Sequence, residues 1–274
     1  MLNAECFSMR ILLLSDMHSN LEALNACLEA APSCDKVANL GDIVGYGGSP
    51  NEVTELARKL GGLVVRGNHD KACTGLMSME DFNPVAAIAA LWTMQALTPE
   101  NMQWLKLMPQ GPVFLPFRYP LNQEETWAGT EADGVQLVHG SPLDEDEYVI
   151  VMRDAQESLL RTNYPLTFFG HTHIQGGFAF ESDRWETLRP IYQGTQNHHE
   201  TWALDLGSAA KYMINPGSVG QPRDGDPRAA CCVFDPDRYE VTFYRVPYNI
   251  EQAQQHIIVA RLPDRLATRL AEGR

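Results

Sequence analysis

The sequence has little clustered positive charge. Its 21 lysine and arginine residues are outnumbered by 35 aspartate and glutamate residues, so the formal net charge is −14, and no dense basic tract occurs. A surface of this charge repels polyanions, which disfavours binding along a nucleic-acid backbone. It does not exclude a small phosphorylated substrate, because bound metal ions supply local positive charge that a residue count omits.

Long hydrophobic runs and an export signal are also missing. The longest apolar stretches fall well short of the roughly 20 residues that a membrane helix needs, so we expect no membrane partner. The opening MLNAECFSMR lacks the charged region and apolar core of a secretory signal. The six cysteines form no CxxC pair, which predicts reduced thiols in a cytoplasmic protein. Adjacent Cys231 and Cys232 are expected on alternate faces of a strand.

The pattern of apolar residues is typical of an α/β protein. Buried strands predicted at 10–16, 36–42 and 62–68 alternate with helical patterns at 20–31 and 51–60, which indicates βαβ units and a parallel sheet. Further elements are predicted at 84–108 (helix in two pieces), 112–117, 135–140, 153–163 (helix), 165–171, 176–214 (short strands), 230–235, 239–246 and 249–260 (helix), with a loop excursion at 118–134. Without a repeat or linker, we expect one domain at 9–274 and an extension at 1–8.

Polar side chains follow five of the predicted strands at the point where each strand ends. The carboxyl ends of parallel strands meet at the edge where open α/β sheets bind ligands. We therefore expect these side chains to lie close together in space. The set consists of Asp16, His18, Asp42, Asn68, His69, His139, His171 and His173.

This accumulation of polar groups predicts a metal centre. A single histidine at a strand end is more often a hydrogen-bonded surface residue, but two aspartates, one asparagine and, besides His69, four histidines on one edge are costly unless something binds them. Imidazoles combined with carboxylates suit Mn²⁺, Fe or Zn²⁺ rather than Ca²⁺ or Mg²⁺ alone. Seven ligands are too many for one ordinary site and suit two sites that share a bridging carboxylate.

Five short motifs resemble, in order and spacing, the motif set of the calcineurin-like metallophosphoesterases. They are DMHSN (16–20), GDIVGYG (41–47), GNHD (67–70), HG (139–140) and GHTH (170–173). A further stretch, NPGSVGQPRDGDPRA at 215–229, resembles the bacterial branch of small phosphodiesterases and diadenosine-tetraphosphatase-like proteins. The resemblance implies a four-layer αββα sandwich of two mixed β-sheets flanked by helices.

The resemblance also implies the ligands of two divalent or trivalent transition metal ions, Mn, Fe, Zn or Ni. One ion would be held by Asp16, His18 and His173, the other by Asn68, His139 and His171, with Asp42 as the bridge. The implied activity is hydrolysis of a phosphoester, as in a phosphodiester, a nucleotide or a dinucleoside polyphosphate. A hydroxide bridging the ions would attack phosphorus.

Three residues near these motifs carry further expectations. His69 would act as general acid and, with Asn68, face the substrate. Arg223 is a candidate phosphate ligand, although the sequence slightly favours a rigid loop in which it pairs with a neighbouring aspartate, Asp224 or Asp226. Asp70 either orients His69 or only caps the turn that carries it.

Two other functions remain open at this stage: a protein serine/threonine phosphatase and a non-catalytic scaffold on the same fold. The complete ligand set favours an enzyme, because scaffolds tolerate its erosion. The substrate, the metals in vivo and a homo-oligomeric partner are left open by the sequence.

Overall fold

The computed structural model describes residues 9–80, 82–116, 134–194, 197–207 and 210–274. The predicted extension at 1–8 and most of the loop excursion therefore lie outside the described residues. The strands are β1 (Ile11–Leu14), β2 (Lys36–Asn39), β3 (Leu63–Val64), β4 (Val113–Pro116), β5 (Gly134–Leu137), β6 (Leu166–Phe168), β7 (Gly176–Glu181), β8 (Arg184–Leu188), β9 (Glu200–Asp205), β10 (Lys211–Asn215), β11 (Ala229–Asp235) and β12 (Glu240–Val246). The helices are α1 (Leu21–Ala30), α2 (Pro50–Leu60), α3 (Asn68–Thr74), α4 (Pro84–Ala96), α5 (Pro99–Lys106), α6 (Met152–Arg161), α7 (Ile250–Val259) and α8 (Asp264–Glu272).

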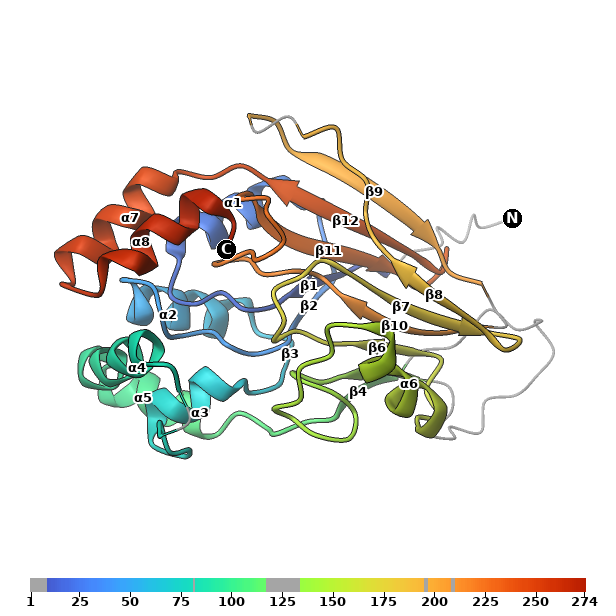
Figure 1. The fold of residues 1–274 in the computed structure, drawn as a ribbon, viewed down its shortest axis with the longest axis horizontal. Helices are drawn as coiled ribbons and strands as arrows, with labels where there is room; N and C mark the ends of the chain where they lie inside the picture. The colour runs from blue at the N-terminus through green and yellow to red at the C-terminus, as the bar shows by residue number, and fades with distance from the viewer. Residues whose placement is uncertain (1–8, 81, 117–133, 195–196, 208–209) are drawn as a thin grey trace, which may run out of the picture.

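The strands form two mixed six-stranded sheets. One has the order β3-β2-β1-β11-β12-β9 and the other β4-β5-β6-β10-β7-β8. The first three strands of the chain are parallel. Strand β11 pairs antiparallel with β1 and lies between it and β12. In the second sheet β5, β6 and β10 are parallel. Figure 1 shows most of the helices at one end of the molecule and the sheets extending toward the other.

Three apolar layers hold the two sheets and their helices together. Between the sheets, Leu13 and Phe234 of the first pack with Phe168 of the second. Outside the first sheet, Leu24 of α1 packs in a second cluster, and outside the second sheet Leu159 of α6 packs in another. The predicted four-layer αββα sandwich is thus confirmed.

Strand β11 shows how one short sequence serves two of these layers. Cys231 packs in the cluster beneath the helices, while its neighbour Cys232 packs in the cluster between the sheets. Both side chains are fully buried, and neither forms a disulfide. The expected alternation of the two thiols is confirmed, and it follows from the two-residue period of a strand.

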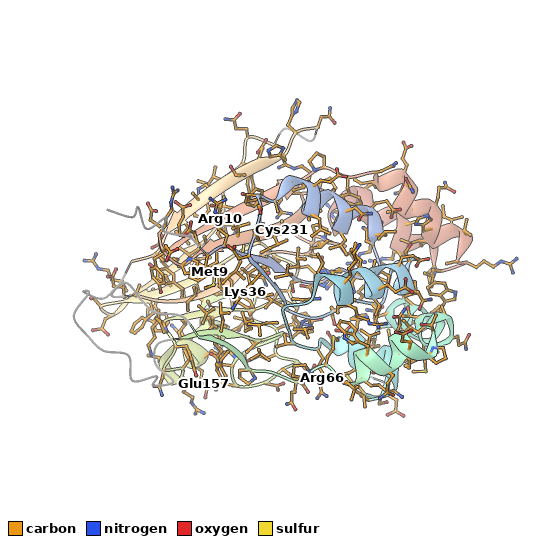
Figure 2. The ribbon with its side chains drawn as sticks, turned by 180° about the vertical axis from the view of Figure 1, so that it is seen from behind. Met9, Arg10, Lys36, Arg66, Glu157 and Cys231 are labelled. Carbon is orange, nitrogen blue, oxygen red and sulfur yellow. The ribbon has the colours of Figure 1, made fainter. Side chains whose placement is uncertain are left out.

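The parallel strands of the first sheet deliver their carboxyl ends to the helical end of the molecule. Figure 2 labels Met9, Arg10 and Lys36 where β1 and β2 begin, at the far end of these strands. Asn20 caps α1 by accepting a hydrogen bond from the Ala23 N–H. Among the described residues, no helix is long and apolar enough to cross a membrane.

Two helices depart from the sequence-based prediction. The stretch RGNHD does not form a simple turn, because Asn68 begins α3 immediately after β3, which is only two residues long. Helix α8 at the end of the chain follows the last predicted helix, at 249–260, and was not predicted. It buries Leu266, Ala267 and Leu270, so it packs by one apolar face.

Candidate metal centre

The backbone at the strand ends is bent into an unusual conformation. Asp16, His18, Asp42, His171 and His173 have φ values of 52°, 44°, 54°, 67° and 60°. This left-handed region costs a residue with a side chain about 1–3 kcal/mol, and it persists only where the surrounding structure dictates it. The strain is concentrated on five of the predicted ligands, so the loops aim these side chains rather than merely connect elements.

The first cluster joins the ends of β1 and β2 to the loop after β6. Possible ligand atoms of Asp16, His18, Asp42 and His173 all lie within 4.8 Å of one another, and all four residues are buried. The Asp16 Oδ2 atom accepts hydrogen bonds from the Ser15 hydroxyl and the His171 N–H. Its Oδ1 atom has no hydrogen-bond partner and lies 3.3 Å from the His173 Nε2 atom.

The two imidazoles of this cluster turn their lone pairs toward each other. His18 Nδ1 lies 3.1 Å from the Val44 carbonyl oxygen, and His173 Nδ1 lies 2.6 Å from the Gln221 carbonyl oxygen. A carbonyl only accepts, so each Nδ1 carries the proton and each neutral ring keeps a lone pair on Nε2. The two Nε2 atoms are nevertheless 3.1 Å apart. Two acceptors at this distance repel unless a cation or a proton lies between them.

The second cluster repeats this arrangement around Asp42, His139 and His171. His139 Nδ1 donates to the Leu40 carbonyl at 2.7 Å, and His171 Nε2 donates to the Asp146 carbonyl at 3.1 Å. The remaining ring nitrogens, His139 Nε2 and His171 Nδ1, face each other at 3.1 Å. The Oδ1 atom of Asn68, another acceptor, lies 3.3 Å from His139 Nε2.

Asp42 is shared by the two clusters. Its Oδ2 atom lies 3.6 Å from His18 Nε2 and 3.5 Å from His139 Nε2. Its Oδ1 atom accepts a hydrogen bond of 2.8 Å from the backbone N–H of His69. Gly67 leaves room for this approach, since a Cβ atom there would lie 2.1 Å from Asp42 Oδ1. The carboxylate thus reaches both clusters and the start of α3.

Burial sets the protonation of these groups. Burial lowers the pKa of His171 to about 3, with His139 adding to the effect, and holds the pKa of His18 and His173 well below the ordinary value. These three rings are therefore neutral at neutral pH, which is the form that binds metals. Burial opposes protonation of His139 too, but the nearby Asp42 carboxylate outweighs it and raises the pKa of His139 to about 9.

The donor set fits transition metal ions. Each of the four rings has its outward nitrogen fixed by a backbone carbonyl, the usual support of metal-binding histidines. The inward nitrogens, the unpartnered Asp16 oxygen, the Asp42 carboxylate and the Asn68 amide oxygen supply the mixed nitrogen and oxygen ligands that Mn²⁺, Fe or Zn²⁺ accept. All seven predicted ligands are thus brought together by the fold.

His69 lies beside the clusters rather than within them. Its ring contacts the Tyr46 and Phe82 rings, with centroids 4.3 and 5.0 Å away, and Gly45 leaves room for it. Burial lowers the pKa of His69 to about 4, although Asp42 acts in the opposite direction. Its side chain lines a cavity of about 210 Å³ that is also lined by Asn68, Met77, Asp146, Tyr148 and His171, among others.

Asp70 caps the loop and the helix. Its carboxylate accepts backbone N–H groups of Gly67, Asp42, Ile43 and Val44, at distances of 2.9, 2.8, 2.9 and 3.3 Å. Both oxygens are therefore used to hold the Asp42 loop against the first turn of α3. Of the two roles considered for Asp70, these contacts support capping.

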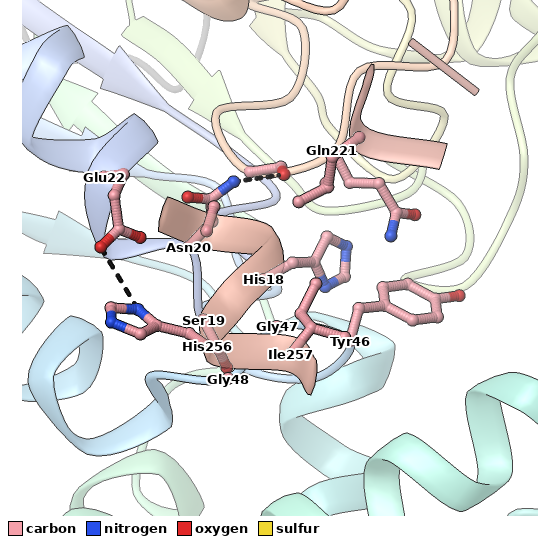
Figure 3. Close-up of a pocket in the computed structure, with 13 residues that line it drawn as sticks. His18, Ser19, Asn20, Glu22, Tyr46, Gly47, Gly48, Gln221, His256 and Ile257 are labelled. Atoms are coloured by element: carbon pink, nitrogen blue, oxygen red, sulfur yellow. Dashed lines mark hydrogen bonds and ion pairs between the residues drawn. The ribbon is translucent and has the colours of Figure 1, made fainter. Parts of the chain in front are cut away.

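Arg223 does not form either of the ion pairs considered from the sequence. Asp224 pairs with Arg245 and Asp226 with Arg228, so both candidate partners are taken. The Arg223 guanidinium instead lies 5.7 Å from the Tyr46 ring centroid and donates to the Gln221 side chain at 3.0 Å. Figure 3 shows His18, Gln221 and Tyr46 gathered on one side of a small adjoining pocket, away from Glu22 and His256.

Several supporting residues were not predicted from the sequence. Tyr148 is half exposed and stacks on His171, with ring centroids 3.7 Å apart. Lys71 of α3 pairs with Glu145 at 3.0 Å and with Asp146 at 2.6 Å. These contacts join the loop of Glu145, Asp146 and Tyr148, which contacts His171, to helix α3. No motif or period in the sequence marks them, because each pairs segments distant along the chain.

The fold and these two clusters define a class of metal-dependent phosphoesterase. Residues 9–238 match the model of the calcineurin-like phosphoesterase superfamily domain, and the chain belongs to this family. Membership implies phosphoester hydrolase activity, and the buried aspartate and histidine clusters are where divalent metal ions would bind.

Individual proteins are similar over almost the whole chain. An uncharacterized protein of Methanocaldococcus jannaschii is 38% identical over 267 residues, which cover 96% of this chain and 98% of that protein. The crystal structure of a metallophosphoesterase from Sphaerobacter thermophilus is 39% identical with a TM-score of 0.77, covering 97% of this chain and 100% of that one. A hypothetical protein from Pyrococcus horikoshii shares the fold at 17% identity and a TM-score of 0.71, covering 97% and 99%.

Proposed function

We propose that this protein hydrolyses a phosphoester bond in a small phosphorylated substrate with the help of two transition metal ions, Mn, Fe, Zn or Ni. The observation that carries the proposal is the convergence of four imidazole nitrogens on two carboxylates, next to a cavity of about 210 Å³. Two hydrogen-bond acceptors, the Nε2 atoms of His18 and His173, would not be held face to face at 3.1 Å in a buried site without a cation to bind. The family to which the chain belongs supports the same reaction class.

In this proposal Asp16, His18 and His173 hold one ion, Asn68, His139 and His171 hold the other, and Asp42 bridges them. When bound, two such ions act as Lewis acids toward a phosphoryl oxygen and generate the attacking nucleophile from water at neutral pH. The bridging role of Asp42 rests on its Oδ2 atom, which lies at nearly equal distances from His18 and His139.

His69 is the proposed general acid. The hydrogen bond from its backbone N–H to Asp42 fixes its position, and its ring lines the cavity where a substrate would lie. A negatively charged phosphoryl group beside the ring favours its protonated form. The ring then donates a proton to the leaving oxygen, a step worth about 10²–10⁴ in rate.

Asn68 and Arg223 are proposed to bind the phosphoryl group. Asn68 begins α3 and lines the same cavity as His69. Its amide can therefore contact the substrate while its oxygen faces the cluster of His139. Burial is the main cause that lowers the pKa of His173 and of His171, and the Arg223 charge lowers both further. The Arg223 charge therefore acts on members of both clusters. A guanidinium placed here suits the non-bridging oxygens of a phosphate.

The test is a substrate panel with Mn²⁺-loaded protein: bis-p-nitrophenyl phosphate, p-nitrophenyl phosphate, cyclic nucleotides, dinucleoside polyphosphates and a phosphoserine peptide. We expect hydrolysis of at least one small phosphoester and none of the peptide. Bound metal with no hydrolysis of any substrate would overturn the proposal in favour of a scaffold. Hydrolysis of the peptide alone would replace it with a protein phosphatase.

A further inference from the structure

Tyr46 connects the metal centre to the last helix of the chain. Its ring centroid is 4.7 Å from that of His18 and 4.3 Å from that of His69. The same side chain belongs to an apolar cluster with Leu266 and Leu270 of α8. Helix α8 therefore packs directly on a residue of the site, although it lies beyond the residues that match the family model.

Two arginines meet at this tyrosine. The guanidinium carbon of Arg223 is 5.7 Å from the Tyr46 ring centroid, and that of Arg269 on α8 is 5.8 Å from it. The segments that carry them are hydrogen-bonded to each other, because the Gly225 N–H donates to the Gly273 carbonyl at 3.0 Å. The backbone thus holds together the two segments that carry these arginines.

Within the described part of the chain, neither arginine forms an ion pair with a carboxylate. Arg223 donates to a neutral side chain, Gln221, and its buried Nε atom has no hydrogen-bond partner. Arg269 donates to the backbone carbonyl of Arg274. Burial, and next the charge of Arg223, lower the pKa of Arg269 to about 10. Two half-buried like charges thus lie at one tyrosine with no carboxylate of the described residues in ion-pair contact with either.

Two tyrosines that line the cavity, Tyr46 and Tyr148, lie within range of the charge of Arg223. The pKa of Tyr46 and of Tyr148 is raised mainly by burial, while Arg223 lowers both through its charge and through hydrogen bonding to their side chains. Tyr148 stacks on His171 of one cluster, and Tyr46 lies against His18 of the other. The charge of Arg223 thus acts on a tyrosine beside each cluster, and Arg269 lies at the ring of Tyr46.

We propose that Arg269, together with Arg223, which also reaches the phosphoryl group at the metal centre, forms a subsite for a second anionic group of the substrate, a phosphate that neighbours that phosphoryl group. The subsite rests on the proposed function and narrows its substrate class. Guanidinium groups bind phosphate through paired N–H donors, and a bound phosphate would give both arginines an anionic partner. The second phosphate belongs either to a phosphoanhydride or to a separate phosphomonoester on the same molecule.

The binding test compares inorganic pyrophosphate with orthophosphate on the Mn²⁺-loaded protein by calorimetry. The variant Arg269→Gln is expected to lower the affinity for pyrophosphate about tenfold more than that for orthophosphate. Arg269→Lys should recover part of the difference, because it keeps the charge. Arg265→Gln, which removes an exposed charge from the same helix, is the matched control and should leave the preference for pyrophosphate as it is.

The kinetic test separates the two sources of the second phosphate. Adenosine diphosphate carries it as an anhydride and adenosine 3′,5′-bisphosphate carries it as a separate ester. We expect Arg269→Gln to lower kcat/KM for at least one of them about tenfold relative to adenosine monophosphate. An Arg269→Gln protein that keeps the wild-type preference for pyrophosphate overturns the subsite. If none of the nucleotides is hydrolysed but the wild type still binds pyrophosphate more tightly than orthophosphate, and Arg269→Gln loses this preference, the proposed function is overturned and the subsite stands.

Discussion

The Nε2 atoms of His18 and His173 face each other at 3.1 Å, although both rings donate their other N–H to a backbone carbonyl. This contact between two acceptors is unfavourable in the metal-free chain, so cations should stabilise the folded state strongly. A ligand at a hundredfold excess over its Kd adds about 2.7 kcal/mol per site. We expect Mn²⁺ to raise Tm by roughly 5 °C or more over the EDTA-treated protein. Equal Tm values in calorimetry, with metal content verified, would contradict this.

Asp42 is the residue on which both clusters depend. Removing its carboxylate in Asp42→Ala takes a ligand from each cluster and leaves the His69 N–H without its acceptor. We expect loss of both ions, measured by elemental analysis of dialysed protein. Glu157→Ala, which alters an exposed pair on α6, is the control and should keep the wild-type metal content. An unchanged metal content in Asp42→Ala would exclude the bridging role.

His69 is expected to affect turnover without affecting metal content. The variant His69→Ala removes a ring that no cluster includes, so elemental analysis should find the same ions as in the wild type. Turnover of the best small phosphoester should fall by about 10² or more, as expected for loss of a general acid. His199→Ala changes an exposed histidine and should retain full turnover. Full activity of His69→Ala would show that another group protonates the leaving oxygen.

Asp70 is predicted to matter for stability more than for chemistry. Its two oxygens accept four backbone N–H groups, and the amide of Asp70→Asn replaces one of these oxygens with a donor. Leaving buried N–H groups unpaired should lower the free energy of unfolding by about 2–3 kcal/mol. Urea denaturation measures this loss directly. A variant as stable as the wild type, with reduced turnover alone, would instead support a role in orienting His69.

Asp226 and Arg228 should contribute to the pH dependence of stability. Burial opposes ionisation of Asp226, but the hydrogen bonds from Arg228 outweigh it and hold the pKa of this carboxyl below 3.8. Because the folded-state pKa is lower than the unfolded one, the stabilisation is complete above about pH 4 and is lost as pH falls through the folded pKa. Asp226→Asn should therefore lessen the loss of Tm between pH 5 and pH 3, as seen by calorimetry. An identical acid profile would show that the pair contributes nothing.

Part of the site was predictable from the ends of the strands. Asp16 and Asp42 follow neighbouring parallel strands of the first sheet, which present their carboxyl ends at one edge. His139 follows β5 of the second sheet, so its place beside them depends on how the two sheets pack. The sandwich of two sheets came from the resemblance of the motifs to a known family, since apolar periodicity alone does not say how two sheets pack. The single domain over 9–274 stays a prediction.

The remainder of the site depends on contacts between distant segments. Arg223 has two aspartates close by in sequence, yet both pair with other arginines, and this choice of partner is made by the tertiary structure. Tyr148 lies in a loop without periodicity, so its stacking on His171 leaves no signal in the sequence. Helix α8 does have apolar residues at helical spacing, so the helix could have been predicted from the sequence. Its packing in one cluster with Tyr46 could not, because no sequence pattern links the two segments.

The adjacent thiols of β11 can report on the order in which the layers of the fold separate during unfolding. Cys231 reports on the layer beneath the helices and Cys232 on the layer between the sheets, and both are fully buried. A thiol reagent therefore reaches each one only when its own layer separates. Mapping which of the two is alkylated first, by mass spectrometry of a peptide that contains both, would show whether the helices detach before the sheets part.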